Sequence, residues 1–430
     1  MNCYNVGVST LDVTPPIGVF LAGYAGRDTP SQDAYHRLRA VCIAIDDGLE
    51  PLLLVSIEWL GFYDRTPDAR RCIQARTGLD PSRILLSGTH THCGPVLRRK
   101  MDIRRHGVID EDYINTSLDQ LAEAAHRALE NREPVRLRAG FGWCGISSSR
   151  RRPDGRGGVQ FKPSLDGPHD HRVSVITVAS EDDNLRAVLY SYACHPTGSG
   201  AITRIGGDYV AFACDAIEKA YPGIVACFFQ GCAGDQKIDA RALESDAYRK
   251  LALDELQEKG GQLGRAVART IDSGDLYPVE GSIDVSQEFL TLATDTVDEE
   301  ELETHLSAGG YVEEWARHHL DLIAAGKPAD RTFSFEVQTV RFGQSLAMIA
   351  LAGEMSVEYA LRFNSELGGA YRDVWTLGYA NEMVGYVPVR RQIPEGGYEV
   401  IDNNRHLLYT GPFAEDTEES IVSAVKRTLL

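Results

Sequence analysis

Two histidines spaced two residues apart are the first residues in this chain that can do chemistry. They lie in the stretch "SGTHTHCGP", residues 87–95, directly after the apolar run 84–86. Imidazole nitrogen is a common zinc ligand in proteins, but His-x-His also occurs in ordinary polar turns. His90 and His92 therefore indicate either a metal site or a turn, and other parts of the sequence must decide between them.

Four further apolar runs also end in polar residues. His195 follows "RAVLYSYAC", Asp235 follows "IVACFFQGCAG", Glu354 follows "LAMIALAG", and Asn381 and Tyr386 follow the run 373–379. Side chains that leave the carboxyl ends of parallel strands converge at one edge of a sheet. Because zinc takes two or three histidine nitrogens and a carboxylate oxygen, with one position left for water, the combined set favours a zinc site.

The elements that must position these residues can be read from hydrophobic periodicity. Amphipathic helices are expected at about 115–130 and 416–430, with a helical pair over 297–325 that breaks at Gly309-Gly310. Residues 144–171, rich in Gly, Pro, Ser and Arg, are expected to form a long loop. Strands are expected in ten β-rich runs: 39–46, 52–59, 83–86, 135–141, 172–178, 187–193, 224–229, 334–342, 346–351 and 373–379.

No composition shift marks a linker, so we expect one large domain over residues 1–430. Its class is α/β (mixed α+β), with mixed β-sheets flanked by helices.

Composition narrows the class of protein. The chain has 430 residues, 43% of them hydrophobic and 25% charged, and a net charge of −18. This acidity argues against nucleic-acid binding and against stable anchoring to anionic membranes. The amino terminus lacks the pattern of a secretory signal, and no apolar run reaches the ~18–20 residues that span a bilayer. A cytoplasmic protein with a small-molecule substrate is the expectation, and the sequence leaves its oligomeric state open.

Cysteine usage bears on the metal. The nine cysteines form no C-x-x-C pair, which is typical of reduced, mostly buried thiols in a reducing compartment. Any metal ligands should then be histidine and carboxylate.

Several of these motifs together resemble the neutral/alkaline non-lysosomal ceramidases, a family of zinc-dependent amidases. The resemblance covers almost the whole chain and its most specific block is "SGTHTHCGP". Other matching stretches are "GVSTLDVTPPIGVFLAGYAGR" (7–27), "VSIEWLGF" (55–62), "CHPTGS" (194–199), "QGCAGDQ" (230–236), "LAGEMS" (351–356) and "ANEMVGYVP" (380–388).

The resemblance implies the catalytic domain fold of that family and a role for each matching residue. The implied zinc ligands are His90, His195, Glu354 and Tyr386. His92 would face the substrate carbonyl as an electrostatic or proton-donating partner. A family arginine falls in "ISSSRRRP", where the register permits positions 150, 151 or 152 and we take Arg150.

Asp235 is the most plausible additional carboxylate, as a base or as a partner of a ligand histidine. Glu58, at the end of "LLLVSIE", is a weaker candidate and more often a strand-end carboxylate that caps a turn.

The sequence departs from the family in two places. Where the ceramidases carry a nucleophilic serine, this chain reads Gly234-Asp235-Gln236-Lys237, with Lys237 or a gap at the serine position. The small carboxyl-terminal β-domain of those enzymes is also expected to be missing. These departures put ceramide itself in doubt as a substrate.

The expected function is therefore a zinc-dependent hydrolase of an amide bond, acting through water that the metal activates. Basic residues near the histidine pair (Arg98, Arg99, Lys100, Arg104, Arg105) and in the 150–156 segment favour a small polar or anionic N-acyl substrate, although solvated loop charges would look the same. Two alternatives stay open: a zinc-dependent lyase or isomerase acting on a polar metabolite, and a non-catalytic binding protein on the same fold.

Overall fold

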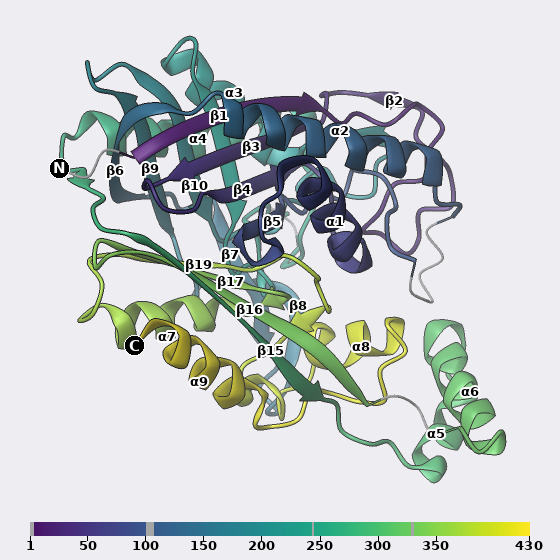
Figure 1. Cartoon of the computed structure of the whole chain (residues 1–430). Coiled ribbons are helices and arrows are strands. Elements are labelled where there is room, and N and C mark those ends of the chain that lie inside the picture. Colours follow the sequence, from purple (N-terminus) through teal and green to yellow (C-terminus); the bar gives the residue numbers. More distant parts are fainter. Residues whose placement is uncertain (1–3, 100–106, 243–244, 328–330) are drawn as a thin grey trace.

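The computed structural model describes residues 4–99, 107–242, 245–327 and 331–430, and its centre is a pair of β-sheets packed face to face (Figure 1). Helices cover the outer face of each sheet. In Figure 1 the larger sheet with α1 and α2 lies above the smaller sheet with α7 and α9. The predicted α/β class, with mixed sheets flanked by helices, is confirmed.

The larger sheet runs in the order β12-β10-β9-β6-β1-β3-β4-β5, with β14 attached to β6. Most neighbours are antiparallel, but β4–β5 and β10–β12 are parallel pairs. The strands are β1 (Tyr4–Asp12), β3 (Arg39–Asp46), β4 (Leu52–Ile57), β5 (Ile84–Gly88), β6 (Glu133–Trp143), β9 (Arg172–Ser180), β10 (Leu185–Tyr192), β12 (Val225–Gln230) and β14 (Tyr277–Pro278).

The smaller sheet has the order β15-β16-β17-β19 and contains a third parallel pair, β17–β19. Its strands are β15 (Ile283–Ala293), β16 (Thr332–Phe342), β17 (Leu346–Leu351) and β19 (Val374–Leu377). Two short pairs lie outside these sheets: β2 (Asp33–Ala34) with β11 (Arg204–Ile205), and β18 (Glu354–Met355) with β20 (Tyr386–Val387).

The apolar faces of the elements explain this layering. Residues of one face of the larger sheet, such as Val6, Ile43 and Leu189, pack against Val340 and Met348 of the smaller sheet. The other face of the larger sheet packs against four helices: α1 (Thr66–Thr77), α2 (Glu111–Glu130), α3 (Asp208–Ala220) and α4 (Leu253–Asp272). The outer face of the smaller sheet packs against α7 (Val357–Leu367) and α9 (Thr417–Leu429).

All ten predicted strands form, although their ends shift by a few residues. The helical pair also forms, as α5 (Glu299–His305) and α6 (Gly310–Ala324), and a short α8 (Asn403–His406) packs against α6. Gly309 and Gly310 both have positive φ (74° and 59°), which explains why the break falls there.

The predicted long loop over 144–171 is wrong. Most of it forms an antiparallel hairpin, β7 (Ser147–Pro153) and β8 (Val159–Ser164), and β7 also pairs with β13 (Gln236–Ile238). Residues 147–151 are buried although they are serines and arginines. Their main chain satisfies its hydrogen bonds in the three-stranded sheet and their side chains face polar partners, so the usual apolar strand pattern is missing.

Isolated bridges join the carboxyl ends of strands from the two sheets. Ser87 pairs with Ala380 and Gly231 with Leu377, so the ends of β5 and β12 both meet the end of β19. A further bridge joins His195 to Lys237. This junction brings the residues after β5, β10, β12, β17 and β19 together. In the part of the chain that the structure describes, no helix is long and apolar enough to cross a membrane.

Candidate metal centre

Three buried histidines converge at this junction. The Nε2 atoms of His90 and His195 lie 3.0 Å apart, and Nε2 of His92 lies 3.3 Å from Nε2 of His90. All three side chains are at most 9% exposed. Of the described residues, these three form a group whose geometry can hold a metal ion.

The Nδ1 atoms of His90 and His195 show which nitrogen of each ring is free to bind a ligand. Nδ1 of His90 lies 2.6 Å from the carbonyl oxygen of Leu60, and Nδ1 of His195 lies 3.0 Å from that of Ala233. Carbonyl oxygens only accept, so each Nδ1 carries the ring proton and each Nε2 of a neutral ring offers a lone pair. Two lone pairs 3.0 Å apart repel unless a cation lies between them, and the arrangement therefore fits a metal.

Glu354 and Tyr386 complete the set that the sequence predicts. Oε2 of Glu354 lies 3.3 Å from Nε2 of His90 and 3.4 Å from Nε2 of His195, yet it accepts no well-directed hydrogen bond among the described residues. The Tyr386 hydroxyl lies 3.2 Å from Nε2 of His195. Both side chains are buried and sit opposite each other in the β18–β20 pair. A buried carboxylate oxygen without a directed partner is a further feature that suits a bound cation.

Burial and neighbouring charges set the protonation of these groups. Burial is the main reason that the pKa values of His92 and His195 fall well below that of a free imidazole. The neighbouring His90 and the charges of Lys237, Arg27 and Arg150 lower the pKa of His92 further. Burial raises the pKa of the Glu354 carboxyl, but the neighbouring His90 and Tyr386 outweigh it and hold that pKa below its usual range. Neutral imidazoles beside a carboxylate are the forms that ligate metals.

The backbone at the centre is strained. His90 has φ 66°, and Tyr379 and Asn381, which follow β19, have φ 57° and 52°. Such left-handed values are unfavourable for residues other than glycine and persist where the surrounding structure enforces them. In this conformation the His90 ring faces His195. The Tyr379 hydroxyl lies 3.1 Å from Nδ1 of His195 and so helps to hold that second ring.

Arg150 lies directly beside this centre. Its guanidinium carbon is 5.0 Å from the ring centroid of Tyr386, and its Nε donates to Glu399 at 2.7 Å. One terminal nitrogen, Nη2, is buried and has no hydrogen-bond partner among the described residues. Arg151 instead points to Glu395 and Glu399, and Arg152 pairs with Asp246. Of the three arginines that the register permits, Arg150 is the one in contact with the centre.

Asp235 lies outside the group formed by the three histidines, Glu354 and Tyr386. Its carboxylate accepts hydrogen bonds from Ser356 Oγ (2.8 Å), the Val357 amide (2.9 Å), Gln392 Nε2 (2.9 Å) and Gln236 Nε2 (3.1 Å). Among the described residues its carboxylate bonds to these groups rather than to a histidine. Because Ser356 and Val357 directly follow β18, Asp235 holds the segment that carries Glu354.

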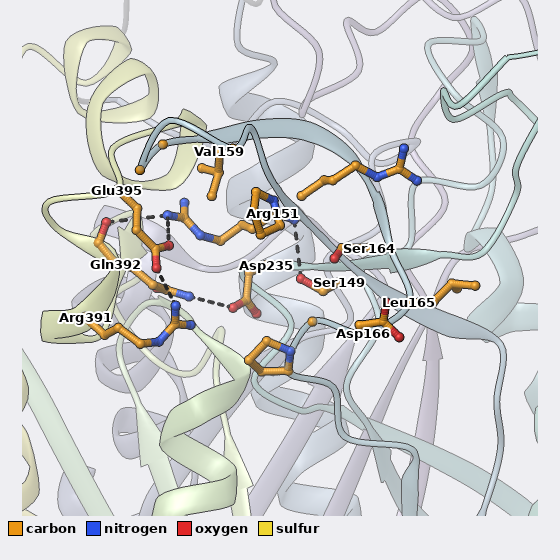
Figure 2. Close-up of a pocket in the computed structure, with 17 residues that line it drawn as sticks. Ser149, Arg151, Val159, Ser164, Leu165, Asp166, Asp235, Arg391, Gln392 and Glu395 are labelled. Atoms are coloured by element: carbon orange, nitrogen blue, oxygen red, sulfur yellow. Dashed lines mark hydrogen bonds and ion pairs between the residues drawn. The ribbon is translucent and has the colours of Figure 1, made fainter.

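Asp235 also borders a cavity of about 740 Å³ on the far side of β7 (Figure 2). The β7–β8 hairpin forms one wall, and Arg391, Gln392 and Glu395 form another. Figure 2 shows the hydrogen bond from Gln392 to Asp235, both of which line the cavity. None of the three histidines lines this cavity, so the cavity is separate from the candidate metal centre.

The two remaining polar candidates have structural contacts. Asn381 joins β5 to β16: its amide group donates to Glu336 and Gln338, and its Oδ1 accepts from the Leu86 amide. Glu58 is buried and accepts from the Arg39 amide at 2.8 Å. Both side chains tie strand ends together.

The basic residues after the histidine pair do not gather freely around the site. Arg99 pairs with Asp68, and the side chain of Arg98 lies over the ring of Tyr63. Lys100, Arg104 and Arg105 lie outside the described residues. Among the described arginines of this set, Arg99, Arg150, Arg151 and Arg152 have carboxylate partners.

Sequence reasoning missed the surroundings of Lys237. This lysine is half-buried on β13, and its ammonium donates to Thr197 Oγ1 at 2.5 Å. Burial, with the nearby charge of Arg150, lowers the pKa of Lys237 to about 8. Tyr24 was also missed; its ring packs against His92 with centroids 5.0 Å apart. The one sequence signal for position 237 was that it falls where the ceramidases carry a nucleophilic serine.

The fold and site together define a two-sheet α/β protein with a buried histidine–carboxylate centre at converging strand ends. No family model and no curated protein sequence matches the chain. Among the solved structures that are similar in fold are two described as ceramidases. One is described as neutral ceramidase from Pseudomonas aeruginosa, with 19% identity and a TM-score of 0.76 over 100% of this chain and 74% of that chain.

The other is described as ceramidase complexed with C2, also with 19% identity and a TM-score of 0.76, over 99% of this chain and 76% of that chain. The chain therefore has the fold of the neutral ceramidase catalytic domain, as the sequence resemblance implied.

Proposed function

We propose that this chain is a zinc-dependent hydrolase that cleaves an amide bond in a small polar or anionic N-acyl compound. The observation that carries the proposal is the pair of Nε2 lone pairs of His90 and His195, which face each other and Oε2 of Glu354. The shared fold with two structures described as ceramidases supports amide chemistry.

Zinc fits the donors better than softer or harder metals. His90, His195, Glu354 and Tyr386 offer nitrogen and oxygen atoms, and the nearby thiol of Cys93 bonds to Ser199 instead. When bound, Zn²⁺ supplies a Lewis acid for a carbonyl oxygen and makes water a competent nucleophile near neutral pH.

The chain's own residues would orient and polarise the substrate. His92 is buried, neutral and has an unpartnered Nδ1, and Arg150 has an unpartnered Nη2. Both can donate a hydrogen bond to the oxygen on which negative charge develops during attack on a carbonyl. Asp235 would act as a positioning residue through the segment of Glu354, and water would replace the missing serine as nucleophile.

Metal analysis is the direct test. Protein purified without chelator should contain close to one zinc per chain, and His195→Ala should lose most of it. His126→Ala on α2 is the matched control, because His126 bonds to Glu130 away from the site. Wild-type protein without bound metal after zinc supplementation would contradict the proposal.

Product analysis separates hydrolysis from the lyase or isomerase alternative. Hydrolysis of a panel of acidic N-acyl compounds in ¹⁸O-labelled water should place the label in the released carboxylate. A lyase would leave an unsaturated product without the label. Efficient turnover of short-chain ceramide together with inactivity on the acidic panel would reject the proposed substrate class.

We also propose a reducing, cytoplasmic location. Eight of the nine cysteines lie in described segments, and all eight are free thiols. Cysteines that react with an alkylating agent in fresh cell extract only after reduction would contradict this location.

A further inference from the structure

Two cations beside the histidine cluster, the buried Arg27 and the half-buried Lys237, lack a carboxylate hydrogen-bond partner among the described residues. Arg27 is only 5% exposed, and its Nη1 donates to the Ala22 carbonyl oxygen at 2.9 Å. Its Nε and Nη2 are buried without a hydrogen-bond partner. Lys237 bonds to the hydroxyl and carbonyl oxygens of Thr197. Among the described residues, neither cation forms an ion pair with a carboxylate.

Tyr24 links these two cations to the site. The Arg27 guanidinium lies over the Tyr24 ring, 5.2 Å from its centroid. The Tyr24 hydroxyl donates to the Thr197 carbonyl oxygen at 3.4 Å, the same oxygen that Lys237 approaches at 3.3 Å. The Tyr24 ring packs edge-on against His92. Arg27 and Lys237 therefore flank the ring that touches His92, one at its face and the other at its hydroxyl end.

This arrangement is costly in the free protein. Removing an unpaired cation from water is unfavourable, and native proteins usually pair such groups with carboxylates, as this chain does for Arg70 with Glu336. At Arg27 and Lys237 the missing negative charge can come from a ligand. An oxyanion can accept the unused N–H groups in charge-assisted hydrogen bonds.

We infer that Lys237 and Arg27 form an anion subsite next to the metal centre that binds a carboxylate carried by the substrate. This inference rests on the proposed function and deepens it. It places the carboxylate on the portion of the N-acyl compound that lies toward Tyr24 and His92. The lysine at the position of the family serine then serves recognition of the substrate.

A ligand that cannot be hydrolysed separates binding from turnover. 4-Oxononanoate replaces the amide nitrogen of N-hexanoylglycine with a methylene group and keeps the carboxylate. 4-Oxononanamide is its uncharged counterpart. In titration calorimetry with the zinc-loaded protein, we expect the carboxylate to bind about 10-fold or more tightly than the amide, as charge-assisted hydrogen bonds would give.

Variants locate that preference. Lys237→Met keeps the length of the side chain without its charge, and Arg27→Gln removes the guanidinium. Each single variant should reduce the preference for the carboxylate over the amide. The double variant should abolish that preference. Lys219→Met, at an exposed position on α3, removes the same charge and should leave the preference unchanged. Melting curves identify any variant that fails to fold, and Lys237→Gln then serves in place of Lys237→Met.

Equal binding of carboxylate and amide by the wild type, or a preference that survives the double variant, would overturn the subsite. If the preference follows Lys237 but N-hexanoylglycine is not hydrolysed, the subsite stands and the hydrolase proposal fails. If N-hexanoylglycine and N-hexanoylglycinamide are hydrolysed equally well, the hydrolase stands and the subsite fails.

Discussion

At the scale of single residues, Gly23 offers a way to test the role of His92. Gly23 has φ 95°, and a Cβ atom there would lie 2.2 Å from Nδ1 of His92. Gly23→Ala should displace the ring and lower kcat/KM about 10-fold or more, because a misplaced donor stabilises the developing oxyanion poorly. Zinc content should change little, since His92 is not one of the expected ligands.

Gly18→Ala is the matched control for Gly23→Ala. Gly18 has a similar φ of 102°, but a Cβ there would meet no atom within 4 Å. Both variants carry the backbone cost of a left-handed alanine, about 1 kcal/mol. An equal loss of activity in the two variants would show that strain in this loop, rather than the His92 contact, is responsible.

The sequence predicted that His90, His195 and Glu354 lie close together, but it did not predict which backbone groups hold the histidine rings. His90, His195 and Glu354 were found because each follows an apolar run, and the structure brings all three within 3.4 Å of a neighbour in the set. The carbonyl oxygens of Leu60 and Ala233, which fix the ring protons, could not be predicted. They contact histidines 30 and 38 residues away, and no local pattern encodes which carbonyl a ring will face.

At the scale of elements, Asp235 joins the end of β12 to β18 and α7. Asp235→Asn replaces one carboxylate oxygen with an NH2 group, whereas the Val357 amide N–H and Gln392 Nε2 that face it can only donate. We expect a loss of about 2–4 kcal/mol in the free energy of unfolding, because buried donors lose a charged acceptor. Zinc affinity should fall with it, since Glu354 sits two residues before Ser356.

Denaturant titration and zinc competition measure these two effects. Asp239→Asn is the control, because the partner of Asp239 is an exposed Arg241, and it should change stability by less than ~1 kcal/mol. Unchanged stability and zinc affinity with lost turnover would instead identify Asp235 as a catalytic base.

The same scale shows where sequence patterns fail. Strands β3 and β17 are nearly continuous apolar runs and were predicted with their observed bounds. Strand β7 reads as serines and arginines because it lies between a polar cavity and the metal centre rather than in an apolar core. Hydrophobic periodicity reports burial against apolar neighbours, so a strand buried among polar groups escapes it.

At the scale of the whole molecule, the centre connects the two sheets. His90 and His195 follow strands of the larger sheet, whereas Glu354 and Tyr386 follow strands of the smaller one. A metal bound only by the folded chain stabilises it by roughly 3–4 kcal/mol at 100 to 1,000 times its dissociation constant. Chelation should therefore lower the melting temperature by about 3–4 °C, measured by calorimetry. In His195→Ala the chelator should have no effect.

The separation of the expected ligands along the chain has a kinetic consequence. His195 lies 105 residues from His90 and 191 from Tyr386, so no early folding intermediate built from neighbouring segments can hold the ion. Zinc should then leave the refolding rate unchanged and slow unfolding by nearly its full stabilising effect. Stopped-flow refolding and manual-mixing unfolding, each with and without zinc, would measure both rates. Faster refolding in zinc would mean that the two sheets join before the rest of the molecule has folded.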